Sequence, residues 1–214
     1  DDPAMVSRLA QILSSSTTRL EEMVRDLLDL GRLEQPELAV RADALPLSDL
    51  ASRLAPPFDK ACAERDLTLR FEIEPPDAVV RTDEYLLSLV LRNLIDNAVK
   101  FAHEGTEVVA TMRIGALERR DPGEGERRRQ ARFEHDATLE LRVFDRGEGI
   151  PLKQQQRVFE RFYQVDASRA RSGNRRGTGL GLAIVKHAVG QLGGTVTLES
   201  VWQQGTTVTV RVPT

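Results

Sequence analysis

Residues 6–30 carry a heptad repeat of apolar side chains, a pattern that requires a partner surface along its length. The repeat advances by alternating steps of three and four residues, and one of its positions is polar. Further apolar residues widen the stripe beyond the seam of a two-stranded coiled coil, which favours a bundle of several helices formed by dimerisation. The repeat consists of Val6, Leu9, Leu13, Ser16, Leu20, Met23, Leu27 and Leu30, and the widening residues are Ile12, Val24 and Leu28.

The residues that flank this repeat suit the two ends of a helix. Asp2 and Pro3 fit an N-cap and a first helical position, and Gly31 and Pro36 bracket the end. The sequence therefore predicts one long amphipathic helix over residues 3–34. Periodicity alone does not distinguish a bundle helix from an amphipathic helix that packs on its own domain.

The rest of the chain mixes helices and strands. A helix is expected from Pro46 to about Arg65, kinked or divided at Pro56-Pro57. Further helices are expected over 83–102 and 180–192, and strands over 67–73, 79–80, 106–114, 138–144, 195–200 and 206–212. This order predicts an α+β fold in which helices are layered on one face of a mixed sheet.

Composition excludes several classes of protein. Of the 214 residues 40% are hydrophobic and 29% charged, a balance typical of a packed globular chain rather than a disordered one. The net charge of -3 gives no broad electropositive field, so neither nucleic acid nor an anionic membrane is an expected partner. No apolar run approaches the roughly 20 residues that cross a bilayer, and we expect a soluble chain with Cys62 in its core.

The stretch from Glu118 to Asp136 is unlike the rest of the chain. It contains six arginines, six acidic residues and few apolar groups. Because its charges balance, it indicates a solvated hairpin extension or a disordered insertion, over about 116–137, rather than a nucleic-acid patch.

Asn93, Asn97 and Lys100 share one edge of the helix expected over 83–102. Their spacing of i, i+4 and i+7 places them beside the core-facing stripe. Amide oxygens near a lysine suit a magnesium ion surrounded by phosphate oxygens. The alternative is that the asparagines cap neighbouring loops and that the lysine is simply solvated.

A carboxylate and two glycines follow the strand expected over 138–144. The segment Asp145 to Ile150 reads Asp-Arg-Gly-Glu-Gly-Ile. An ionised carboxylate only accepts hydrogen bonds, so Asp145 suits an exocyclic amine such as that of adenine. Gly147 and Gly149 would permit close approach of a bound base. A plain turn after a strand explains the same residues.

A second glycine-rich segment runs directly into the helix expected over 180–192. Residues 176–182 read Arg-Gly-Thr-Gly-Leu-Gly-Leu, and backbone N–H groups at a helix N-terminus form a cradle for phosphate. The spacing matches neither the dinucleotide-binding nor the Walker pattern. A structural glycine turn is the alternative.

Between these segments lie an aromatic cluster, 159–163, and a polar run rich in glycine and arginine, 166–176. This combination predicts a mobile lid hinged at the aromatic cluster. Arginines of the run could then meet phosphates on closure, namely Arg169, Arg171, Arg175 or Arg176. The alternative is a flexible loop whose phenylalanines belong to the core.

The order and spacing of these motifs together resemble the sensor histidine kinases of two-component signalling. The resemblance covers nearly the whole chain except the charged insertion. Residues 93–101 look like the N box of that family, and residues 145–150 look like its first glycine box. Residues 159–163 look like its F box, and residues 177–181 look like its second glycine box, with similarity continuing through 183–186. Residues 26–34 look like the end of the second helix of its dimerisation hairpin.

This resemblance implies a two-layer α/β sandwich of the Bergerat type, shared with gyrase and heat-shock chaperone ATPases, that binds Mg-ATP. By analogy Asp145 would hold the adenine amine, Asn97 with Asn93 would coordinate or position Mg²⁺, and Lys100 would contact phosphate. Asn93, Asn97 and Lys100 would then be catalytic in transferring the γ-phosphoryl group of ATP to a histidine nitrogen. The other ATP-binding residues implied are Phe101, Gly147, Gly149, Ile150, Phe162, Arg175, Arg176, Gly177, Thr178, Gly179, Leu180 and Gly181.

The sequence departs from that family at the phosphoryl acceptor. The acceptor histidine of the family lies on the first hairpin helix, in a His-Glu-Leu-Arg-x-Pro-like context, upstream of where this chain begins. His103, His135 and His187 have no such context, and we interpret all three as structural or solvated. The chain is therefore expected to bind ATP without phosphorylating itself.

The resemblance also predicts the organisation and surroundings of the chain. Residues 1–34 would be the second helix of the hairpin, 35–46 a linker and 47–214 the catalytic domain. A response regulator receiver domain and a second copy of the N-terminal helix are the expected protein partners, and the expected location is the cytoplasm, with any membrane anchor outside this sequence. The rival hypotheses are a related gyrase-like ATPase and a non-enzymatic ATP-binding module.

Overall fold

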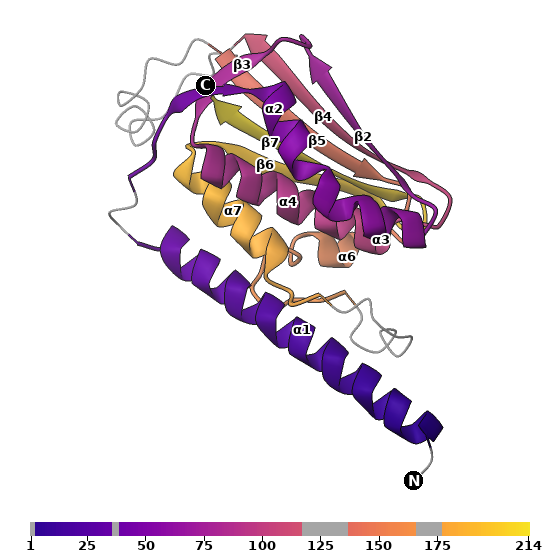
Figure 1. Ribbon diagram of the computed structural model, residues 1–214. Coiled ribbons are helices and arrows are strands. Elements are labelled where there is room, and N and C mark those ends of the chain that lie inside the picture. The colour runs from indigo at the N-terminus through magenta and orange to yellow at the C-terminus, as the bar shows by residue number, and fades with distance from the viewer. Residues whose placement is uncertain (1–2, 36–38, 117–136, 166–176) are drawn as a thin grey trace.

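The computed structural model describes residues 3–35, 39–116, 137–165 and 177–214 (Figure 1). Its first element is the long helix α1 (Pro3–Leu33), as the heptad repeat predicts. Most of α1 projects away from the remainder of the chain, and its C-terminal part runs beside α7 (Gly181–Gln191). Leu30 and Leu33 are buried there, whereas the apolar stripe from Met5 to Leu28 is largely exposed.

The central element is a mixed five-stranded sheet with the order β2-β4-β5-β7-β6. Strand β2 pairs with β4 in parallel, and the other neighbours are antiparallel. The strands are β2 (Thr68–Glu74), β4 (Glu107–Ala116), β5 (Ala137–Asp145), β6 (Thr195–Val201) and β7 (Gly205–Pro213). A separate two-stranded sheet joins β1 (Asp43–Pro46) to β3 (Val79–Thr82).

Helices cover one face of the large sheet (Figure 1). They are α2 (Leu47–Leu54), the 3₁₀ turn η1 (Pro56–Phe58), α3 (Asp59–Glu64), α4 (Glu84–Phe101) and α7. The prolines at 56 and 57 divide α2 from α3, as expected, because a proline lacks the amide hydrogen that a continuing helix needs. The predicted α+β fold with helices on one face of a mixed sheet is confirmed.

Helix α4 is the centre of the core. Asp83 caps its N-terminus by accepting a hydrogen bond from the amide of Leu86 at 3.0 Å. One face of α4 is apolar and fully buried, through Leu87 and Leu91 among others, and α4 packs against the sheet, α2 and α7. Because this face is fixed by packing, the polar edge beside it is held in one orientation toward α7.

Two short elements were not expected from the sequence. Strand β1 lies in the stretch 35–46 predicted as a linker, and α6 (Leu152–Gln155) follows the first glycine-rich segment. Both are too short to show a period. The charged stretch 117–136 and the run 166–176 lie outside the described residues. None of the described helices combines the length and apolarity that crossing a membrane requires.

Candidate functional site

Three of the segments singled out in the sequence line one cavity of about 830 Å³. Asn93, Asn97 and Lys100 reach it from α4, and Asp145 reaches it from the end of β5. The second glycine-rich segment contributes Gly177, Thr178, Gly179 and Gly181 at the start of α7. Residues separated by up to 88 positions along the chain, from Asn93 to Gly181, therefore surround one space.

The asparagines lie directly against the start of α7. Asn93 donates its side-chain amide to the carbonyl of Leu89 at 2.8 Å, so its amide oxygen is left to face Gly181. A Cβ atom added at Gly181 would lie 3.1 Å from that oxygen and 3.6 Å from the side-chain nitrogen of Asn97. The lack of a side chain at Gly181 thus lets the helix terminus approach the amide edge.

Lys100 lies between carboxylates of two helices. Its ammonium is 2.7 Å from Asp96 on the preceding turn of α4. Burial lowers the pKa of Lys100, but Asp96, together with Glu22 and Asp26 of α1, outweighs this effect and raises the pKa above its usual range. The side chain is therefore a cation directed into a partly enclosed, negatively charged part of the cavity.

Asp145 is the most deeply buried carboxylate of the cavity. Its Oδ1 atom is inaccessible to solvent and has no hydrogen-bond partner among the described residues. Burial raises the pKa of Asp145 to about 7, and the backbone amide of Thr206 opposes this shift only in part. A buried carboxylate is costly unless donors satisfy it, so Asp145, which lines the cavity, fits a ligand that supplies an N–H group.

The glycines after Asp145 pack against the protein's own backbone. A Cβ atom at Gly147 would overlap the carbonyl oxygen of Phe101, and one at Gly149 would overlap that of Val201. Gly149 also has a φ of +63°, which disfavours a side chain. Gly149 and Ile150 line the cavity, whereas Gly147 does not. These glycines thus fix the loop between the end of α4 and the turn after β6.

Thr178 is held from two sides within the second glycine-rich segment. It donates its hydroxyl to Asp26 Oδ2 of α1 at 2.6 Å and accepts a hydrogen bond from the amide of Leu180 at 3.2 Å. Leu180 itself is buried in the core and does not line the cavity. Gly179, with a φ of +75°, lets the segment pass the backbone of Phe162.

Helix α1 forms one wall of the cavity, which the sequence did not indicate. Glu22, Arg25 and Asp26 all line it. Burial raises the pKa of Asp26, while the Thr178 hydrogen bond and Lys100 act in the opposite direction. In a heptad pattern these residues occupy polar positions that are normally solvated, so the periodicity does not mark them as cavity residues, although Asp26 begins the segment that resembles the dimerisation hairpin.

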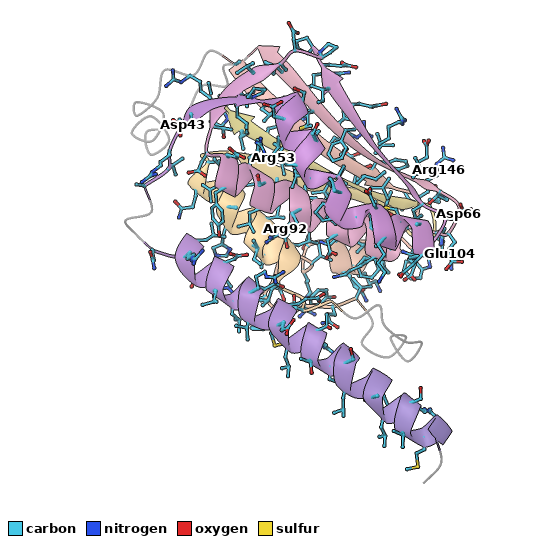
Figure 2. All side chains as sticks on the ribbon, viewed as in Figure 1. Asp43, Arg53, Asp66, Arg92, Glu104 and Arg146 are labelled. Carbon is cyan, nitrogen blue, oxygen red and sulfur yellow. The ribbon has the colours of Figure 1, made fainter. Side chains whose placement is uncertain are left out.

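A second set of contacts holds α1 against α4. Asp29, which is buried, accepts hydrogen bonds from the hydroxyl of Tyr85 at 2.8 Å and from the guanidinium of Arg92 at 3.2 Å. Figure 2 shows Arg92 on α4, on the side that faces α1. Near the end of α1, Glu34 pairs with Arg161, and Gln191 donates to the carbonyl of Leu33 at 2.8 Å.

Only some of the remaining predicted residues lie at the cavity. Phe101 lines the cavity although it is partly exposed, and Phe162 is exposed and does not line it. Arg175 and Arg176, like the other candidate lid arginines, lie outside the described residues. The sequence did not single out Trp202 and Gln203, which line the cavity from the turn between β6 and β7.

Two of the three histidines lie within the described residues. His103 lines the cavity near the end of α4. His187 contacts Arg161 at 3.3 Å and the carbonyl of Ala183 at 2.8 Å, on the side of α7 that faces Glu34. His135 falls in the stretch that the structure does not describe.

Comparisons with known proteins found a matching family and related sequences. A family model described as histidine kinase-, DNA gyrase B-, and HSP90-like ATPase matches residues 82–214. The sensor-like histidine kinase SenX3 of Mycolicibacterium smegmatis is 33% identical over 213 residues, which cover 100% of this chain and 50% of that protein.

Two solved structures share the fold. Full-length ShkA in complex with AMPPNP has a TM-score of 0.72 at 24% identity, over 97% of this chain and 38% of that one. Histidine kinase ThkA in complex with the response regulator protein TrrA has a TM-score of 0.69 at 20% identity, over 100% and 52% of the two chains.

The chain therefore belongs to the family of histidine kinase-, DNA gyrase B- and HSP90-like ATPases. Within that family, its resemblance to the sensor histidine kinases is confirmed. The chain spans about half the length of the SenX3 relatives that it matches.

Proposed function

We propose that this chain binds Mg-ATP in the cavity between α4, α7 and the end of β5, and transfers the γ-phosphoryl group to a histidine. The observation that carries this proposal is the convergence of the asparagine edge, Asp145 and the start of α7 on one cavity. ATP binding as such is a property of the family to which the chain belongs. The residue roles and the acceptor are the parts that we infer.

Asp145 marks the end of the cavity that receives adenine. Its carboxylate is buried and lines the cavity, so it fits the exocyclic amine of the base, which would donate a hydrogen bond to it. Ile150 and Val143 line the same cavity and provide apolar contacts for the base. Of the nucleobases, one that carries an amine toward Asp145 is thereby favoured.

The asparagine edge receives the phosphates and the metal. Among the described residues no cluster of three histidine, cysteine or acidic side chains could hold a metal without help. Amide oxygens from Asn93 and Asn97 suit Mg²⁺, which keeps most of its coordination for phosphate and water. Bound there, Mg²⁺ would neutralise charge on the transferring phosphoryl group.

Lys100 and the start of α7 bind the phosphate chain. The ammonium of Lys100 lies on the same helix edge as the asparagines and supplies a positive charge. Amide N–H groups of the segment 177–181, at the positive end of α7, supply directed donors. Arg175 or Arg176 would add charge from the adjoining run.

The acceptor histidine is expected in another region of the intact protein. His103 and His187 lie on or after helices of the catalytic fold, and His187 is engaged by Arg161 and Ala183. We therefore infer that the chain donates the phosphoryl group to the first helix of a dimerisation hairpin, with α1 as the second helix.

The protein partners follow from the same inference. The exposed stripe of α1, including Leu13, Leu20 and Leu27, offers an apolar face for a first hairpin helix and a second copy of α1. A response regulator would then take the phosphoryl group from the histidine. The complex of ThkA with TrrA supports such a partner for this chain.

The proposal is tested by supplying the missing acceptor. The chain is incubated with ATP labelled at its γ-phosphate, alone and with a separate hairpin that carries the histidine. We expect acid-labile label on the hairpin and none on the chain alone. Label retained on the chain would contradict the inferred acceptor, and no transfer to the hairpin would favour a non-enzymatic module.

Substitution of Asn97 by Ala tests the proposed magnesium role in the same assay. We expect at least about a hundredfold loss of transfer, because the metal would lose a ligand. Ser88→Ala is the matched control, since Ser88 lies on the same helix and does not line the cavity. Unchanged transfer by Asn97→Ala would rule out the magnesium role.

A further inference from the structure

The single tryptophan of the chain lies at the Asp145 end of the cavity. Trp202 lies in the turn between β6 and β7 and lines the cavity, and 37% of its surface is exposed to solvent. The same turn leads into Gly205, which pairs with Val201 of β6, and then into Thr206, which lies opposite Asp145 at the end of β5. Trp202 and Asp145 are therefore brought to one part of the cavity by strand pairing.

Several hydrogen bonds fix this turn against the loop that follows Asp145. The amide of Gln203 donates to the carbonyl of Glu148 at 2.7 Å, and the amide of Ile150 donates to Ser200 Oγ at 2.8 Å. Gly149 packs so closely that a Cβ atom there would lie 3.0 Å from Trp202 Cα. The backbone position of Trp202 relative to Ile150 is thus set by the fold.

The lining around Trp202 suits a flat apolar ligand. Val143, Ile150, Leu198 and Val208 line the cavity near the paired ends of β5, β6 and β7. Apart from Asp145 and Glu148, the charged groups of the cavity, Lys100 among them, come instead from α4 and α1. The cavity is consequently divided into an apolar end and a charged end.

We propose that Trp202 is a binding residue for the nucleotide base, covering one face of the adenine ring whose amine is held by Asp145. This inference rests on the proposed nucleotide function and adds a residue to it. Stacking on an aromatic face depends on the ring rather than on its substituents. Asp145 would therefore select the amine, whereas Trp202 would contribute affinity for any purine ring.

Tryptophan fluorescence tests this assignment directly, because Trp202 is the only tryptophan. The chain is titrated with Mg-ADP, with the diphosphate of purine riboside, which lacks the amine, and with magnesium-bound inorganic triphosphate. We expect a saturable change of emission with the two purine ligands and none with triphosphate. An unchanged emission at ADP concentrations that calorimetry shows to be saturating would overturn the assignment.

Substitution then measures the contribution of the ring. Trp202→Ala should lower the affinity for both purine ligands by the same factor, about tenfold. Trp202→Phe should restore most of this affinity, as expected for base stacking. Val201→Ala is the matched control, because Val201, the neighbouring residue at the end of β6, is exposed and does not line the cavity. Thermal unfolding of each variant identifies any that has lost its fold.

The outcomes distinguish the two proposals. If the unsubstituted chain takes up no ADP in calorimetry, the nucleotide function is overturned, and the role of Trp202 with it. If the unsubstituted chain binds ADP and a folded Trp202→Ala chain binds it equally well, only the role of Trp202 is overturned.

Discussion

Thr178 donates its hydroxyl to Asp26 across 2.6 Å and thereby joins the glycine-rich segment before α7 to helix α1. The two residues are 152 positions apart in the chain. Glu22, one turn earlier on α1, lines the same cavity. Helix α1 thus brings carboxylates to the part of the cavity in which we place the phosphates.

We predict that Asp26→Asn increases the affinity for Mg-ADP by about threefold at low salt, because it removes a negative charge that faces the phosphates. Calorimetry at two salt concentrations measures this effect, which should shrink at the higher one. Glu21→Gln is the control, since Glu21 is exposed on the same helix and does not line the cavity. Weaker binding by Asp26→Asn would show that the carboxylate assists the nucleotide instead.

The raised pKa of Asp145 predicts a pH dependence of stability. The pKa is about 7 in the folded chain against 3.8 as its ordinary value. The folded state therefore binds the proton more tightly than the unfolded state does. The free energy of unfolding consequently decreases as the pH rises from about 4 to about 7. Asp145→Asn should remove this loss and raise the free energy of unfolding above pH 7 by on the order of 3 kcal/mol.

Denaturant unfolding of the nucleotide-free chain at a series of pH values checks this prediction. Asp77→Asn serves as the control, because Asp77 is exposed. The two variants should differ above neutral pH and converge with the unsubstituted chain in acid. Parallel curves for Asp145→Asn and the unsubstituted chain would contradict the effect of burial on this carboxylate.

The outline of the fold follows from the sequence because its elements are long and periodic. The heptad repeat predicts α1 to within a residue at its end, and the prolines at 56 and 57 predict the break between α2 and α3. Strand β1 has four residues and includes Pro46, so its pairing with β3 depends on a partner that local pattern does not reveal.

The candidate site follows from the sequence only where chemistry is concentrated in a motif. Asn93, Asp145 and Gly181 each stand in such a segment, and the structure places all three at one cavity. Asp26 and Trp202 contribute to that cavity through tertiary packing, from a polar helix position and a hairpin turn. Local sequence gives such positions no distinguishing mark.

Two glycines of α7 provide a matched pair of substitutions. At Gly181 an added methyl group would lie 3.1 Å from Asn93 Oδ1, whereas at Gly190 it would meet no atom within 4 Å. Gly190→Ala should stabilise the chain by about 0.5 to 1 kcal/mol, through helix propensity, without changing nucleotide affinity. Gly181→Ala should weaken Mg-ADP binding by about tenfold, because it displaces the amide edge.

Thermal unfolding and calorimetry on the two variants measure both effects. The prediction concerns the difference in nucleotide affinity between the two variants, since both substitutions replace glycine by alanine in the same helix. Equal nucleotide affinity in the two variants would show that the contact between Gly181 and Asn93 has no part in binding.

The attachment of α1 to the rest of the chain includes a small buried apolar contact beside the polar ones. Leu33 is 1% exposed at the end of α1, whereas Leu152 on α6 is 81% exposed. Leu33→Ala should lower the free energy of unfolding by about 2 to 4 kcal/mol, as expected for a buried leucine, and Leu152→Ala by less than about 0.5 kcal/mol. Chemical denaturation measures both values, and equal losses would contradict the packing of α1 on α7.

The most direct test of the proposed function is calorimetric titration of the chain with Mg-ADP. We expect saturable binding at one site, weakened by about tenfold in Asp145→Ala, which removes the acceptor for the base amine. Asn97→Ala should bind nucleotide with little or no dependence on Mg²⁺. Absence of binding by the unsubstituted chain, or unchanged binding in both variants, would contradict the assembly of one Mg-nucleotide site from these segments.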